Sequence, residues 1–105
     1  MELTPQEAAE RIAAGEADLV DVREPYEWEA GHIDAARHVT LPELAEFAQT
    51  LDPERPVVFV CRVGGRSAMA TDAFRRAGFD AYNLGGGMVA WEREGLPFDG
   101  TVADH

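Results

Sequence analysis

The sequence contains no lysine, so arginine supplies all 9 of its basic side chains. Against 20 acidic residues they leave a formal net charge of −11. This balance argues against nucleic acid or an anionic membrane surface as a partner, because both carry negative charge. Any anion-binding site in this chain must be built from guanidinium groups and backbone N–H groups.

Cysteine is also scarce. The single residue, Cys61, excludes an internal disulfide and argues against a cysteine-based metal site. The 3 histidines are not clustered, so we expect neither a metal nor a cofactor. A lone cysteine is most often a small buried hydrophobic residue. A chemical role for Cys61 therefore has to be argued from its neighbours.

Long hydrophobic runs are absent, and none approaches the length of a transmembrane helix. The first four residues also lack the basic start and apolar stretch of a signal peptide. We therefore expect a cytoplasmic protein. Its 105 residues suit one domain over 1–105, with a core over about 4–98 and a short C-terminal tail that we expect to be loose.

Predicted strands and helices alternate along the chain. Strands are expected at 19–22, 37–39, 57–60 and 81–84. Helices are expected over 5–14 and 41–50, with a brief helical piece within 24–31. Two more helices are expected, one from the loop after Cys61 to Ala77 and one from the glycines at 85–87 through Trp91. Residues Thr4–Glu7 and Thr40–Glu43 are predicted capping boxes. On the third helix Ala70, Ala73, Phe74 and Ala77 have the spacing of one buried face. The pattern predicts an α/β fold, a small, mostly parallel central sheet with helices on both faces.

Cys61 directly follows Val57–Val60, the most apolar predicted strand. Ligands of such sheets bind beyond the carboxyl ends of the strands, and Cys61 lies at that end. The loop behind it leads into a helix N-terminus, where free N–H groups attract anions. Gly64 and Gly65 let the backbone curl into an anion nest, while Arg62 and Arg66 add positive charge. All of these features favour a thiolate, the reactive form of cysteine.

The loop Cys61-Arg62-Val63-Gly64-Gly65-Arg66-Ser67 resembles the active-site loop of the rhodanese family. Further similar segments are Asp21–Pro25, Gly31–Ile33 and Gly86–Trp91, in the family's order. The resemblance covers roughly residues 4–98 and implies a rhodanese-like fold and a sulfurtransferase of the thiosulfate:cyanide type.

The resemblance implies that Cys61 is the catalytic residue and carries sulfur as a persulfide. The donor would be thiosulfate or a similar small sulfur-containing anion, and the acceptor cyanide or a thiol, which a protein can also supply. The residues expected to bind the substrate are Arg62, Val63, Gly64, Gly65, Arg66 and Ser67. The loop amides would hold the persulfide, and both arginines would bind the donor's oxygens through paired hydrogen bonds.

Four other polar or aromatic side chains are less informative. We interpret Asp21 and Arg23 as an ion pair that fixes a loop, and His32 as a packing histidine, because the proposed chemistry needs no general base. Trp28 could line the mouth of the site or pack over the edge of the sheet.

Two other functions compete with sulfur transfer by a free enzyme. Dual-specificity phosphatases that share the fold have five residues between cysteine and arginine, whereas four separate Cys61 from Arg66 here. A shorter loop suits a single sulfur better than a phosphate. A persulfide carrier or regulatory binding module that acts with a protein partner remains the second hypothesis.

Overall fold

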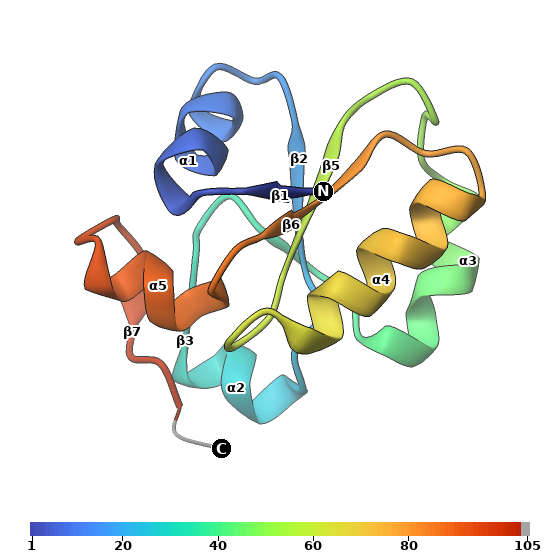
Figure 1. The fold of residues 1–105 in the computed structure, drawn as a ribbon. Helices are drawn as coiled ribbons and strands as arrows, with labels where there is room; N and C mark the ends of the chain where they lie inside the picture. Colours follow the sequence, from blue (N-terminus) through green and yellow to red (C-terminus); the bar gives the residue numbers. More distant parts are fainter. Residues whose placement is uncertain (104–105) are drawn as a thin grey trace.

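The computed structural model describes residues 1–103. Its main sheet has five strands in the order β1-β6-β5-β2-β4, and all neighbouring strands are parallel (Figure 1). The strands are β1 (Glu2–Leu3), β2 (Asp18–Asp21), β4 (Arg37–His38), β5 (Val57–Val60) and β6 (Ala81–Leu84). The predicted mostly parallel sheet is confirmed, and β5 is its central strand.

Helices cover both faces of this sheet (Figure 1). The helices are α1 (Pro5–Ala13), α2 (Pro25–Ala30), α3 (Leu44–Ala48), α4 (Gly65–Arg76) and α5 (Gly87–Arg93). Helices α1 and α5 pack on the face that carries Val58 and Val60, and α3 and α4 on the face that carries Val57 and Phe59. Successive side chains of a strand point to opposite faces, so an entirely apolar strand such as β5 supplies both cores. Among residues 1–103, no helix has the length and apolar character needed to cross a membrane.

The two capping boxes form different structures. Thr4 and Glu7 cap α1 reciprocally, as predicted. Thr40 and Glu43 instead begin a 3₁₀ turn, η1 (Leu41–Glu43), before α3 starts at Leu44 and ends at Ala48. The expected helix over 41–50 is therefore a 3₁₀ turn followed by a short α-helix, because the first turn closes with hydrogen bonds between residues i and i+3.

The buried face of α4 also differs from the prediction. Ala70 and Phe74 are buried, together with Ser67 and Thr71, whereas Ala73 and Ala77 are exposed. Polar side chains at 67 and 71 thus take inward positions of the helix. The apolar pattern did not identify them because it treats serine and threonine as surface residues.

The expected loose tail is wrong for residues 99–103. Strand β7 (Asp99–Gly100) pairs antiparallel with β3 (Gly31–His32), and the Thr101 N–H donates to the Ala30 carbonyl at 2.9 Å. Gly31 and Gly100 permit this pairing, since a Cβ on either would clash with the backbone of the other segment. Two glycines far apart in the sequence gave no pairing signal beforehand.

Candidate active site at the carboxyl end of the sheet

Cys61 lies at the junction between β5 and α4, as the sequence predicted. Its side chain is 1% exposed and packs in the core cluster under α3 and α4. Helix α4 begins four residues later, after Gly64 in the left-handed conformation with φ 108°. Glycine adopts this conformation at little cost, and the sharp reversal turns the start of α4 toward the sulfur.

Two backbone N–H groups and one hydroxyl lie around the Cys61 Sγ. The backbone N–H groups of Gly64 and Ser67 lie at 3.1 and 3.4 Å, and the Ser67 hydroxyl lies at 3.2 Å. The N-cap residue of α4 makes no side-chain cap, so the sulfur occupies the place of a capping group at this helix N-terminus. Free N–H groups at a helix N-terminus are able to bind an anion.

The carbonyls that flank the sulfur are held by α5. The Met88 and Val89 N–H groups donate to the Cys61 and Arg62 carbonyls at 2.8 and 3.0 Å. Gly87 makes this approach possible, since its φ is 60° and a Cβ there would clash with both carbonyls. The first turn of α5 therefore fixes the start of the loop.

Arg66 forms a two-point ion pair with Glu27 of α2. Its NH1 and NH2 lie 2.7 and 2.9 Å from Glu27 Oε1 and Oε2, and the carboxylate is almost fully buried. The hydrogen bonds from Arg66 hold the pKa of Glu27 below its ordinary value, and the pair raises the pKa of Arg66 in return. The nearby Cys61 also contributes to the rise of the Arg66 pKa, so this guanidinium lies within electrostatic reach of the sulfur.

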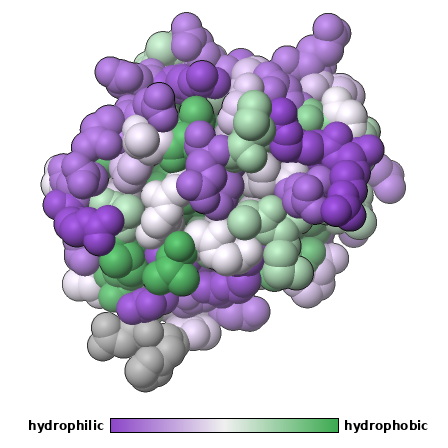
Figure 2. All heavy atoms as spheres, viewed as in Figure 1, coloured by the Kyte–Doolittle hydropathy of each residue, from purple (hydrophilic) through white to green (hydrophobic). Residues whose placement is uncertain are grey.

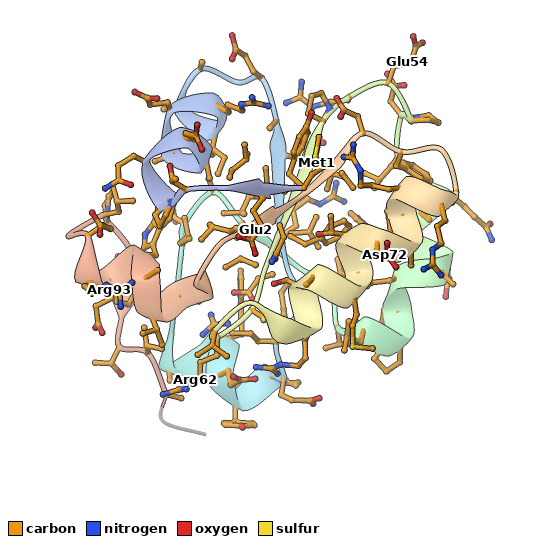
Figure 3. The ribbon with its side chains drawn as sticks, viewed as in Figure 1. Met1, Glu2, Glu54, Arg62, Asp72 and Arg93 are labelled. Carbon is orange, nitrogen blue, oxygen red and sulfur yellow. The ribbon has the colours of Figure 1, made fainter. Side chains whose placement is uncertain are left out.

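Arg62 has a different partner, because its Nε donates to the Ala103 carbonyl at 2.8 Å. Figure 3 shows Arg62 at the lower end of the molecule. The structure thus places both arginines at the site but gives each of them a partner within the protein.

The remaining loop residues form the rim of the site. Val63 is 58% exposed, and Gly65 is exposed at the start of α4. Tyr26 of α2 is 53% exposed and lies close enough to Arg66 to influence its pKa. The exposed apolar and aromatic side chains of Val63 and Tyr26 therefore belong to the loop of the buried sulfur and to the helix that pairs with Arg66.

Asp21 and Arg23 form the predicted ion pair. Both are fully buried, with Arg23 NH2 at 2.7 Å from Asp21 Oδ2, and the same nitrogen donates to the Gly31 carbonyl at 2.8 Å. The pair therefore ties the end of β2 to the start of β3.

Trp28 packs rather than lining the mouth of the site. Its ring stacks on His32 at 3.7 Å and on His38 at 4.8 Å between ring centroids. The His32 ring N–H at Nδ1 donates to the Trp28 carbonyl at 2.7 Å, which supports the interpretation of His32 as a packing histidine.

Sequence reasoning missed two residues at the site. Glu27 was hidden because it also completes a capping box with Glu24, where its Oε1 accepts the Glu24 N–H. Asn83 lies on β6, where its Oδ1 is 2.6 Å from the Ser67 hydroxyl oxygen. Its only sequence signal is an amide in an otherwise apolar strand next to β5.

Comparison with known proteins identifies the family of this chain. The family model of the rhodanese-like domain, which describes the sequences of that family, matches residues 4–94. The chain belongs to the rhodanese family. The family assignment and the fold expected from the resemblance are both confirmed.

Two relatives of this rhodanese-like chain have names that contain the word sulfurtransferase. YtwF of Bacillus subtilis is 38% identical over 97 residues, which cover 91% of this chain and 94% of YtwF. The adenylyltransferase/sulfurtransferase MoeZ of Mycobacterium tuberculosis is 39% identical over 99 residues, or 90% of this chain but 25% of MoeZ. The chain thus spans a quarter of the length of MoeZ. The crystal structure of a rhodanese-related protein from Thermoplasma volcanium superposes with a TM-score of 0.84 at 28% identity, covering 92% of this chain and 95% of that protein.

Proposed function

We propose that this rhodanese-family protein moves a sulfane sulfur from a donor to an acceptor through a persulfide on Cys61. The observation that carries the proposal is the Cys61 sulfur itself, capping α4 within hydrogen-bond distance of the Gly64 and Ser67 N–H groups. An uncharged thiol needs no such donors, whereas a thiolate or persulfide anion is stabilised by them.

The transfer takes place in two steps, with thiosulfate as the proposed donor. The Cys61 thiolate attacks the outer sulfur of thiosulfate, the sulfur–sulfur bond of the donor breaks, and sulfite leaves with the bonding electron pair. Cys61 then carries a persulfide anion. Cyanide or a thiolate attacks its terminal sulfur, the new sulfur–sulfur bond breaks, and the Cys61 thiolate is restored as thiocyanate or an acceptor persulfide departs. Neither step needs a general base once the thiolate has formed.

The loop offers further donors for the terminal sulfur. Among residues 1–103, the backbone N–H groups at 62, 63, 65 and 66 donate to no acceptor. They belong to the loop that begins at Cys61, and with Gly64 and Ser67 they complete the proposed persulfide-binding ring. Anionic donor oxygens would be bound by Arg62 and Arg66 once these exchange their internal partners for the substrate.

The experiment that tests this function is the intact mass of the reduced protein after incubation with thiosulfate. A gain of one sulfur, about 32 Da, is expected on the wild-type protein, and added cyanide should remove it as thiocyanate. Cys61→Ser is the matched control and should gain nothing. A wild-type protein that takes up no sulfur from thiosulfate or from a low-molecular-weight persulfide would overturn the proposal.

A second candidate is a carrier that receives its sulfur from a partner protein. It is favoured by the internal partners of the two arginines, Glu27 and the Ala103 carbonyl, which a small anion must displace. The exposed Val63 and Tyr26 at the rim suit a protein surface better than an inorganic anion. In the same mass experiment this candidate predicts slow uptake from thiosulfate and rapid uptake from a persulfidated protein. The expected cytoplasmic location remains a prediction under either candidate.

A further inference from the structure

The Ser67 hydroxyl lies between two groups that both need its proton. Its oxygen is 3.2 Å from the Cys61 Sγ and 2.6 Å from Asn83 Oδ1. A serine hydroxyl has one proton, so it can donate to the sulfur or to the amide oxygen but not to both. All three side chains are buried, which leaves little room for water to resolve the conflict.

The orientation of the Asn83 amide decides which partner receives the proton. Its Nδ2 faces two acceptors, the Gly64 carbonyl at 3.2 Å and the Glu2 carboxylate at 3.3 Å. Figure 3 shows Glu2 on β1 close to β6, the strand of Asn83. If the amide were flipped, its Oδ1 would face the Gly64 carbonyl oxygen and the Glu2 carboxylate, and none of these oxygens could donate a hydrogen bond. Asn83 Oδ1 therefore faces Ser67. Because Oδ1 has no proton to give, Ser67 has to be the donor in the 2.6 Å contact.

With its proton on Asn83, Ser67 presents a lone pair to the sulfur. This orientation of the Ser67 hydroxyl suits a neutral Cys61 S–H, which can donate to Ser67 Oγ, and it opposes the stabilisation of a thiolate by the Gly64 and Ser67 N–H groups. To donate to a thiolate or persulfide, the hydroxyl must rotate away from Asn83 and leave a buried amide oxygen without a partner. Such an unpaired group is costly in a protein interior.

We propose that Asn83 is a positioning residue that controls the charge state of Cys61 by competing with the sulfur for the proton of Ser67. While Cys61 is neutral, the hydrogen bonds run from sulfur to Ser67 and from Ser67 to Asn83. When the sulfur becomes negative, the Ser67 hydroxyl turns to it and Asn83 loses its donor. The proposal deepens the proposed function and rests on it only for the catalytic consequence, since the competition itself requires no sulfur transfer.

The proposed exchange of hydrogen bonds does not involve the charged side chains near the sulfur. Arg66 of α4, which is paired with Glu27 of α2, is within electrostatic reach of the sulfur, and Arg62 belongs to the same loop. Glu2 of β1 lies behind Asn83 and makes no hydrogen bond to the sulfur. The Gly64 carbonyl also accepts the Ala68 N–H at 3.0 Å, so α4 continues to hold Gly64 when Asn83 is replaced.

The experiment measures how fast a neutral alkylating reagent, iodoacetamide, modifies Cys61 at neutral pH, relative to the plateau rate at high pH. Asn83→Leu preserves the volume and removes the acceptor, so Ser67 is free to donate to the thiolate. The relative rate should rise about five-fold or more, as expected when one buried hydrogen bond no longer has to be broken. In a Ser67→Ala background the same Asn83→Leu change should have no effect, because the competing proton is gone.

An Asn83→Leu rate that is unchanged or lower, or a rise that persists in the Ser67→Ala background, would overturn the proposal. Asn83→Ala is the second variant and serves if Asn83→Leu does not fold, because it also removes the acceptor and places no oxygen opposite Glu2 and Gly64. It should raise the relative rate as well, and the rise should disappear in the Ser67→Ala background. No rise, or a rise of equal size in both backgrounds, would also overturn the proposal.

The two proposals fail separately. Alkylation reports the thiolate whether or not the protein transfers sulfur. Normal alkylation responses without sulfur uptake would remove the proposed function and keep the role of Asn83. Sulfur uptake together with an alkylation rate that Asn83→Leu does not change would keep the proposed function and remove the role of Asn83.

Discussion

The Glu27 carboxylate performs two tasks at once, because one of its oxygens caps α2 while both bind the Arg66 guanidinium. A buried carboxylate survives in its charged form only when it is paired in this way. Its partner Arg66 is partly exposed, at 34% of its side-chain surface. The pair therefore joins the interior of the molecule to the surface at the site.

This pair predicts a specific dependence of stability on pH. The pKa of Glu27 in the folded protein lies below its ordinary value of 4.5, mainly through the hydrogen bonds from Arg66. The charged carboxylate thus stabilises the fold above that value, and the contribution is lost as the pH falls through the lower folded pKa. We expect Glu27→Gln to reduce the free energy of unfolding by on the order of 1–3 kcal/mol at neutral pH, and by progressively less in acid.

Urea unfolding of the wild type and of Glu27→Gln over a pH series measures this difference. The exposed pair of Arg76 and Asp72 supplies the control, Asp72→Asn, which should change stability little at any pH because surface ion pairs contribute little. A Glu27→Gln deficit that is the same at acidic and neutral pH would show that the ion pair is not its source.

At the scale of elements, the first turn of α5 holds the start of the Cys61 loop through the Met88 and Val89 N–H groups. We expect Gly87→Ala to destabilise the protein by about 3 kcal/mol or more, since it combines an unfavourable φ with a clash against the carbonyls of Cys61 and Arg62. Gly15→Ala is the matched control, with a similar φ of 72° and open space around the added Cβ, and should cost about 1–2 kcal/mol.

Thermal unfolding and sulfur uptake of the two variants test this prediction. Gly87→Ala should also slow sulfur uptake, because displaced carbonyls move the loop that follows, whereas Gly15→Ala should leave uptake unchanged. Equal losses of stability in both variants would mean that only the backbone conformation matters, and that α5 does not support the loop.

Local sequence patterns predicted most of these elements but few of the contacts between them. The three longer strands, β2, β5 and β6, and the start of α1 follow from apolar runs and capping residues. The Cys61 loop was recognised because its residues are adjacent in sequence. Glu27 and Asn83 reach the site from α2 and β6, and β7 joins β3 across nearly 70 residues. Such pairings depend on how the sheet brings distant segments together, and this information is not local.

For the molecule as a whole, the net charge of −11 is spread over a body with a radius of gyration of 12.3 Å. Figure 2 shows many hydrophilic residues over the visible face, with a small hydrophobic group at its lower left. Thiosulfate carries two negative charges, so long-range repulsion opposes its approach before it reaches the arginines.

We therefore expect the rate constant of sulfur uptake from thiosulfate to increase when sodium chloride is added, because salt screens this repulsion over distances beyond about 10 Å. Alkylation of Cys61 by the neutral iodoacetamide is the control and should be nearly independent of salt. Uptake that slows with salt would indicate that the local field of Arg62 and Arg66 dominates the encounter.

The hydrogen bond between Arg62 and the Ala103 carbonyl has a practical consequence for protein engineering. A linker that follows Ala103 would start beside the Cys61 loop, whereas one that precedes Met1 would start at the edge strand β1. A C-terminal fusion with a short linker would hold its cargo next to Cys61 and could deliver a tethered acceptor thiol at high local concentration. An N-terminal tag is the better choice when an unobstructed site is needed.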